Sequence, residues 1–211
     1  MGKLADQLQA KLQPGMTIPG PLLRLYEWIE AKGAFIERDN GIRVACLFTR
    51  EETETEGGTG IAFFAGEDDR LDLWLGNDDP EVLKRLCVFA KSGGDGSKAA
   101  FWIAGDGSQK IVHLGSGSGS TLACVLAHDA VDFLRLLAIG YDEICWDENF
   151  NTPPEIPVRE GTPARLFQEW VEQSFQARIP KTASEIVEHP DSMDDDDPSD
   201  EFARWLSASN G

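Results

Sequence analysis

The sequence predicts an α+β fold in which a single, mostly antiparallel sheet, arranged as a meander, is flanked by helices. Between residues 93 and 127, short apolar runs alternate with glycine-rich corners, a pattern typical of strands that pair with their chain neighbours. Before and after this region, apolar residues recur at intervals of three and four, the period of an amphipathic helix. The length of 211 residues suits one globular domain with decorated ends.

Two amphipathic helices are expected at the N-terminus. The first places Leu4, Leu8 and Leu12 on one face and lacks the apolar stretch of a signal peptide. The second spans residues 21–32, with proline in its first turn and Gly33 directly after its last residue. Both helices therefore carry an apolar face that needs a packing partner.

Strands are expected after these helices. Two apolar-rich runs flank Asn40-Gly41, a dipeptide that favours the type I′ turn of a hairpin. Residues 51–60, EETETEGGTG, are expected to form an exposed acidic loop. Residues 61–66 and 71–76 are expected to be two further strands, the second because leucine occupies every other position along it.

The central region is expected to hold a short helix, three strands and a longer helix. Asp79 as N-cap and Pro80 at the first helical position begin the short helix, which carries Val82, Leu83 and Leu86. The three strands are expected at residues 99–104, 110–115 and 121–127. The second helix has Asp129 as its N-cap and stops at Gly140.

The composition changes after residue 150. Residues 151–163 are rich in proline and are expected to be a linker. A helix then runs through Arg178, and five of its apolar residues are expected to be buried: Leu166, Phe167, Trp170, Val171 and Phe175. The aspartates of the tail are expected to be solvated, and Asp197-Pro198 is expected to cap a last helix that packs. The domain organisation expected is a core over 1–150, the linker over 151–163, and helices over 164–211 that pack on the core and carry the acidic tail segment.

The glycine-rich stretch GGDGSKAAFWIAGDGSQKIVHLGSGSGS, at residues 93–120, could be a ligand loop or a set of sheet corners. A P-loop needs Gly-Lys-Ser/Thr before a helix, which this sequence lacks. GSGSG at 115–119 runs from strand to strand, whereas a dinucleotide loop or a nucleophile elbow leads into a helix. The two Asp-Gly-Ser turns lack the spaced oxygen ligands of an EF-hand. We therefore expect sheet corners.

Charge and cysteine content narrow the classes of function. The four cysteines lie far apart in sequence, which argues against a zinc site or a redox dithiol. With 37 acidic and 19 basic residues, the net charge of −18 disfavours nucleic acids and anionic membranes and favours a basic partner. Carboxylates flanking Trp146 could supply an acid/base pair, but such clusters are common in so acidic a chain. We expect no catalytic residue, no metal and no cofactor, and hence not an enzyme.

One stretch of the sequence is similar to a known superfamily. It reads LCVFAKSGGDGSKAAFWIAGDGSQKIVHLGSGSGSTLACVLAHDAVDFLRLLAIGYDEICWDE and is followed by a helix and by SDEFARWL near the end. The residues resemble the SUKH superfamily of Smi/Knr-like immunity proteins, which is related to Syd, most clearly over 60–150. Phe101 and Trp102 beside the glycine corners, and the DFLRLLAIG helix, carry most of the likeness. The resemblance implies an α+β fold, no shared catalytic residues, and cytosolic proteins that bind and inhibit toxins, commonly nucleases.

Charge and resemblance together give a functional hypothesis. The chain is expected to be a cytoplasmic immunity protein that binds a cognate, basic, nuclease-type toxin; the alternative is a non-enzymatic adaptor or regulatory module on the same fold. No nucleic acid or membrane is expected as a partner. The expected partner-binding residues are the acidic residues of three segments: Glu51, Glu52, Glu54, Glu56, Asp68, Asp69, Asp142, Glu143, Asp147 and Glu148.

Overall fold

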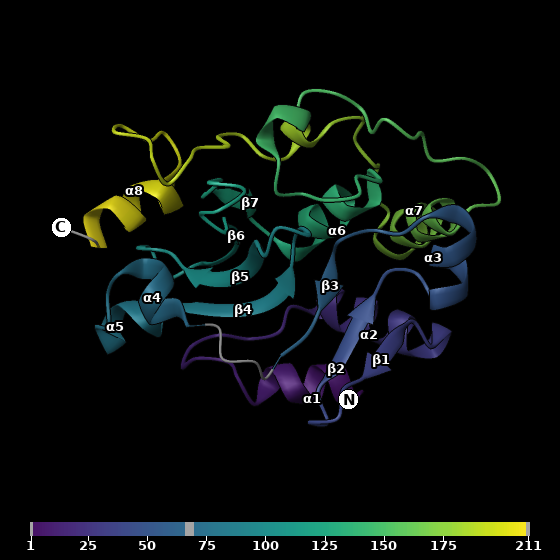
Figure 1. The fold of residues 1–211 in the computed structure, drawn as a ribbon, viewed down its shortest axis with the longest axis horizontal. Coiled ribbons are helices and arrows are strands. Elements are labelled where there is room, and N and C mark those ends of the chain that lie inside the picture. The colour runs from purple at the N-terminus through teal and green to yellow at the C-terminus, as the bar shows by residue number, and fades with distance from the viewer. Residues whose placement is uncertain (1, 66–69, 210–211) are drawn as a thin grey trace.

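The fold is known from a computed structural model, which describes residues 2–65 and 70–209. Within these residues the chain forms one antiparallel sheet of seven strands, in which each strand pairs with the next along the chain (Figure 1). The strands are β1 (Phe35–Glu37), β2 (Arg43–Cys46), β3 (Ala62–Phe63), β4 (Leu86–Lys91), β5 (Lys98–Ile103), β6 (Gln109–Leu114) and β7 (Val125–Ala127). The predicted α+β fold, with an antiparallel meander flanked by helices, is confirmed.

Helices of two groups flank this sheet, and Figure 1 shows α4, α5 and α8 gathered at the left, away from α2, α3, α6 and α7. The α-helices are α1 (Lys3–Gln9), α2 (Gly20–Lys32), α3 (Arg50–Glu56), α4 (Leu71–Leu75), α5 (Pro80–Leu83), α6 (Ala130–Ala138), α7 (Pro163–Phe175) and α8 (Glu201–Ser209). Two 3-10 turns, η1 (Asp147–Asn149) and η2 (Ala183–Glu185), lie in the C-terminal third.

The larger core lies between one face of the sheet and helices α1, α2, α6 and α7. Phe89 of β4 and Phe101 of β5 stack there with ring centroids 4.4 Å apart, and Phe133 of α6 meets Phe89 edge-on at 5.6 Å. Trp28 of α2 contacts Phe167 of α7 at 5.5 Å. Alternation along each strand turns every second side chain to this face, which is why a continuous aromatic core forms here.

The smaller core lies on the opposite face, under α4, α5 and α8. Trp102 of β5 is its centre, and its ring lies 5.2 Å from Phe202 and 5.6 Å from Trp205, both of α8. Asp200 caps α8 because its Oδ1 accepts hydrogen bonds from the amides of Phe202 (2.8 Å) and Ala203 (3.1 Å). The last helix packs as predicted, but the prediction that Asp197 caps it is wrong, since the cap is Asp200, three residues later, and the helix begins at Glu201.

The segment predicted as a strand over 71–76 is the helix α4. Alternation of leucine is a weak signal in so short a segment, because Leu71, Trp74 and Leu75 also have helical spacing. These three side chains contact the smaller core, whereas Leu73 is 67% exposed. The indole of Trp74 donates a 2.6 Å hydrogen bond to the carbonyl of Gly115, which fixes the helix to the sheet.

The predicted hairpin at Asn40-Gly41 forms between β1 and β2, but its turn is not type I′. Only Gly41 has a positive φ (81°), whereas type I′ requires two such residues. The amide of Gly41 donates to the carbonyl of Arg38 (2.8 Å) and the amide of Arg38 to that of Ile42 (2.9 Å). This is a type I turn followed by a left-handed glycine, the usual three-residue hairpin loop.

Other boundaries also differ from the prediction. Leu86, placed by its spacing on the short helix, begins β4, whose five leading residues are buried. β7 covers only the end of the predicted strand 121–127, because Leu122 instead bridges Ser192 of the tail. On α7, Phe167 and Val171 are buried but Leu166 is 52% exposed, so the expected burial of all five apolar residues is wrong.

The glycine-rich stretch forms sheet corners, as predicted. Each of the three connections between β4 and β7 contains a glycine with a positive φ: Gly96 between β4 and β5, Gly107 between β5 and β6, and Gly117 between β6 and β7. Glycine adopts this conformation without the steric penalty that a Cβ brings.

Candidate functional site

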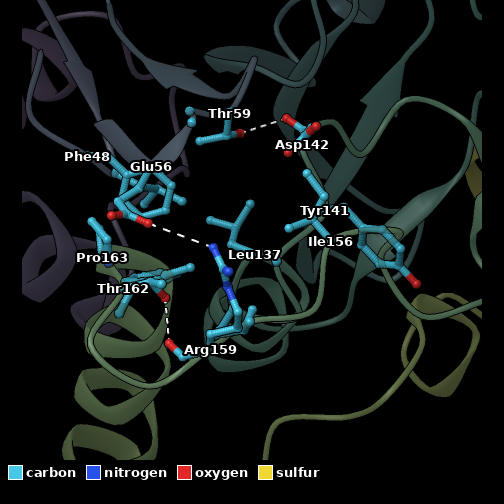
Figure 2. Close-up of a pocket in the computed structure, with 18 of the residues that line it drawn as sticks. Phe48, Glu56, Thr59, Leu137, Tyr141, Asp142, Ile156, Arg159, Thr162 and Pro163 are labelled. Atoms are coloured by element: carbon cyan, nitrogen blue, oxygen red, sulfur yellow. Dashed lines mark hydrogen bonds and ion pairs between the residues drawn. The ribbon is translucent and has the colours of Figure 1, made fainter. Parts of the chain in front are cut away.

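A groove lies where the end of α3, the segment after α6 and the proline-rich segment meet (Figure 2). It consists of two adjoining hollows of about 170 Å³ and about 620 Å³ that share residues 58–59, 140–142 and 156. Its three walls are residues 56–60, 140–143 and 152–159, and we call it the acidic groove. Two of the three acidic segments predicted to bind a partner therefore reach the same site.

The first wall begins at the end of α3. Residues 51–60 were predicted to be a loop, but the first six of them belong to this helix. A capping box starts this helix: Thr49 Oγ1 accepts from the amide of Glu52 (3.2 Å), and the Glu52 carboxylate accepts from the amide of Thr49 (2.7 Å). Glu52 also pairs with Lys32 at 2.9 Å. The Thr-x-x-Glu signature was visible in the sequence, and such a box can start a helix that buries no side chain.

The second wall follows α6 and is tied to the first by its backbone. The carbonyl of Asp142 accepts from the Thr59 hydroxyl (2.7 Å) and from the amide of Gly60 (2.8 Å). The hydroxyl of Tyr141 donates to the carbonyl of Thr152 (2.7 Å), which joins the second wall to the third. The groove thus has walls that are held in place by direct hydrogen bonds.

The third wall is the proline-rich segment, predicted to be a linker. It lies close to the end of α6: a Cβ added to Gly140, whose φ is 100°, would stand 2.6 Å from Val158. Arg159 is held at a bend, because its carbonyl accepts from the Thr162 hydroxyl (2.7 Å) and amide (3.2 Å). None of the residues of this wall was predicted to bind a partner. The signal that could have found them is the alternation of prolines with Glu155 and Ile156.

The floor of the smaller hollow is apolar. Leu137 and Ala138 of α6, Phe167 of α7 and Leu47 line it, and all four are nearly fully buried. Ile156 stands at the rim with 70% of its surface exposed (Figure 2). The smaller hollow therefore has an apolar base and one exposed apolar side chain at its edge.

The rim of the groove is acidic. Glu56, Asp142, Glu143 and Glu155 line it. Partial burial raises the pKa of Asp142, and the negative charges of Glu143 and Glu155 raise it further. The Arg159 guanidinium faces Glu56 across the smaller hollow, with Nη2 and Oε2 3.9 Å apart (Figure 2).

The other predicted partner-binding residues have different places. Glu51 and Glu54 are exposed on α3, where Glu54 pairs with Arg50, and Glu52 is engaged in the capping box. Asp147 and Glu148 lie exposed on η1, outside the groove; partial loss of solvent around the Asp147 carboxylate, with the negative charges of Glu148 and Asp195, raises the pKa of Asp147. Asp68 and Asp69 lie outside the described residues.

Glu143 is held inside the molecule as well as lining the groove. Its carboxylate accepts from the amide of Gly94 (2.5 Å) and from the indole of Trp146 (2.8 Å). This carboxylate therefore positions the second wall against the β4–β5 corner.

Two further findings bear on the chemistry. Among residues 2–65 and 70–209, no group of three or more His, Cys, Asp or Glu side chains is arranged to hold a metal ion. In the part of the chain that the structure describes, no helix has the length and apolar character needed to cross a membrane.

Comparison with family models found no match, and comparisons with curated proteins and with solved structures found none either. The likeness to the SUKH superfamily therefore stays a prediction from the sequence.

Proposed function

We propose that this chain is a cytoplasmic immunity protein that binds and neutralises a basic, nuclease-type toxin domain, as the resemblance to the SUKH superfamily implies. The observation that carries the proposal is the acidic groove: Glu56 and Asp142 line its smaller hollow, which has an apolar floor, and Asp142, Glu143 and Glu155 line the adjoining larger one. The net charge of −18 supports it as well.

The charge has a physical role in this proposal. A nuclease binds phosphates with a basic surface, and an acidic protein can occupy that surface in place of the nucleic acid. Complementary charge raises association rates to about 10⁸–10⁹ M⁻¹s⁻¹ at low salt. Rapid capture is what protection against a toxin needs.

Co-expression with the product of the neighbouring gene tests the proposal. We expect that product to arrest growth alone, and this chain to restore growth and to purify with it. The complex should weaken as salt rises, because the Debye length falls from about 8 Å at physiological salt to about 3 Å at 1 M. A neighbour that is harmless, or that is neither bound nor neutralised, overturns the proposal.

Reversing the charge of single residues tests whether protection depends on the acidic groove. Asp142→Lys should reduce protection, whereas Asp78→Lys, which makes the same charge change at an exposed residue before α5, should not. A complex with a neutral or acidic partner that is insensitive to salt would instead favour the adaptor or regulatory module.

A further inference from the structure

We infer that the acidic groove takes a short basic segment of a protein partner, with an arginine or lysine between Glu56 and Asp142 and an adjacent apolar side chain over Leu137. Arg159 of the chain's own third wall holds part of that place in the absence of the partner. The inference rests on the proposed function, since it names the feature of the basic partner that the groove would recognise.

The position of Arg159 shows what kind of group the groove accepts. Its guanidinium lies 3.9 Å from the Glu56 carboxylate, longer than a good charge-assisted hydrogen bond of about 2.7–2.9 Å. The Arg159 side chain is 69% exposed and that of Glu56 is 43% exposed. A contact so long and so exposed is weak, so a cation from a partner can replace it.

The remaining charge on the rim calls for a cation. Asp142, Glu143 and Glu155 lie close enough for the last two to disfavour ionisation of the first. Among the residues that the structure describes, Arg159 pairs with Glu56 and with none of these three carboxylates. A basic side chain that enters from outside would relieve their repulsion, and an acidic or neutral one would not.

The apolar floor explains why a basic side chain alone is not the whole ligand. Leu137 and Phe167 are 3% and 1% exposed and form the base of a hollow of about 170 Å³. That space suits one apolar side chain rather than a drug-sized molecule, whose pockets measure about 300–1,000 Å³. Ile156 at the rim would close over such a side chain.

Three peptides test the recognition, with the full chain labelled with ¹⁵N for NMR. Acetyl-GSRLRSG-amide carries both features, acetyl-GSRGRSG-amide lacks the apolar anchor, and acetyl-GSELESG-amide reverses the charge. We expect the first to shift amide signals of residues 57–60 and 140–143, the second to bind more weakly, and the third not to bind. Shifts confined to other residues, or equal binding of the first and third peptides, overturn the inference.

Two pairs of variants test the residues. Arg159→Gln should tighten binding of the first peptide roughly two- to fivefold, the range for an exposed ion pair. Its control is Arg178→Gln, which removes the same charge from a residue that is 72% exposed and pairs with Glu185 elsewhere. Glu56→Gln/Asp142→Asn should weaken binding about tenfold, and Asp78→Asn/Glu81→Gln should not. Tighter or weaker binding that is equal in variant and control reflects net charge alone and overturns the inference.

The outcome is distinguishable from that of the co-expression test. Growth protection without peptide binding in the groove keeps the immunity function and removes this site. Peptide binding in the groove without a toxic neighbour keeps the site and removes the immunity function.

Discussion

The two Asp-Gly-Ser corners share one sequence and have different roles. In both, the aspartate accepts from the amide and the hydroxyl of the serine two residues later: Asp95 from Ser97 (2.9 and 2.7 Å) and Asp106 from Ser108 (2.9 and 2.7 Å). In both, the central glycine has a positive φ. The local structure that the tripeptide specifies is therefore the same.

The difference lies in what the rest of the chain brings to each corner. Asp95 Oδ2 also accepts from the Ser116 hydroxyl (2.8 Å) and the amide of Ser120 (2.9 Å), which joins the β4–β5 corner to the β6–β7 connection. Asp106 ends an exposed hairpin. An Asp-Gly-Ser sequence thus specifies a turn, and only a second segment beside it makes the turn a structural junction.

The first corner also supports the acidic groove. The amide of Gly94 donates to Glu143, and the carbonyl of Ser92 accepts from the amide of Ile144 (3.0 Å). Weakening the Asp95 corner should therefore disturb the second wall of the groove, whereas weakening the Asp106 corner should not.

The largest effect is expected from Asp95→Ala. Hydrogen bonds to a charged group contribute about 1.5–3 kcal/mol, and several donors lose their acceptor together. We expect the free energy of unfolding, measured with urea, to fall by about 1.5–3 kcal/mol. Asp106→Ala is the matched control and should change it far less. Equal losses of stability in the two variants would show that the hydrogen bonds from the β6–β7 connection to Asp95 contribute nothing.

The next effect is expected from Gly115→Ala, at the end of β6. A Cβ there would stand 2.6 Å from the carbonyl oxygen of Ser120 and 2.9 Å from that of Leu122, both in the connection that Asp95 holds. Such overpacking costs about 1–3 kcal/mol. We expect thermal unfolding to show a lower stability for Gly115→Ala than for the control Gly105→Ala, where no atom lies within 4 Å of the added Cβ. A stability of Gly115→Ala equal to that of the control contradicts this close approach.

A dependence on pH is expected from His113, which lies under the first corner. Its Nδ1 donates to the carbonyl of Leu122 (2.8 Å) and its Nε2 accepts from the Ser92 hydroxyl (2.9 Å). Burial lowers its pKa to about 4. Because the unfolded chain takes up a proton near pH 6.5 and the folded chain does not, stability falls as pH drops from about 6.5 to about 4.

His113→Gln removes this titration. Urea unfolding at several pH values should show that the difference in free energy of unfolding between wild type and variant narrows as pH falls from about 6.5 to about 4, because only the wild type loses the contribution of His113. Parallel pH profiles would contradict the assignment.

The smallest change in the free energy of unfolding is expected from Ser116→Ala, which removes one of the hydrogen-bond donors to Asp95. The net contribution of a single hydrogen bond is about 0.5–1.5 kcal/mol, and urea unfolding should show a loss in that range. Ser108→Ala, at the exposed corner, should lose less. A greater loss at Ser108 would reverse the comparison.

The fold was largely predictable because most of its signals are local. The caps Asp79 and Asp129, the glycine corners and the helical spacing on α2 and α6 each depend on a few neighbouring residues. The errors fell where a local signal fits two structures: α4 fits a strand equally well, Asn40-Gly41 fits two kinds of turn, and both Asp197 and Asp200 could begin a helix. The predicted burial of Leu166 was wrong for another reason, since its exposure depends on how much of α7 the rest of the chain covers.

The candidate site was predictable only in part. Acidic residues at 56 and 142–143 were expected to bind a partner, yet Glu56 and Asp142 are 86 positions apart in the sequence, and nothing local indicates that they share a groove. Glu52 lies on the same helix as Glu56, but the capping box engages it. The proline-rich wall was not predicted to line a groove because its composition is that of a linker, and nothing local shows which surface such a segment lies against.

By itself the sequence determined the turns, the caps, the amphipathic faces and the excess of negative charge, because each follows from residues close together in the chain. Tertiary structure alone decided which turn became a junction and which acidic residues face one another. Those outcomes depend on hydrogen bonds and packing between segments far apart in sequence, such as Asp95 with Ser120 and Thr59 with Asp142. The same tripeptide at residues 95 and 106 is the clearest case: its local geometry is fixed by covalent neighbours, and its role by what folds against it.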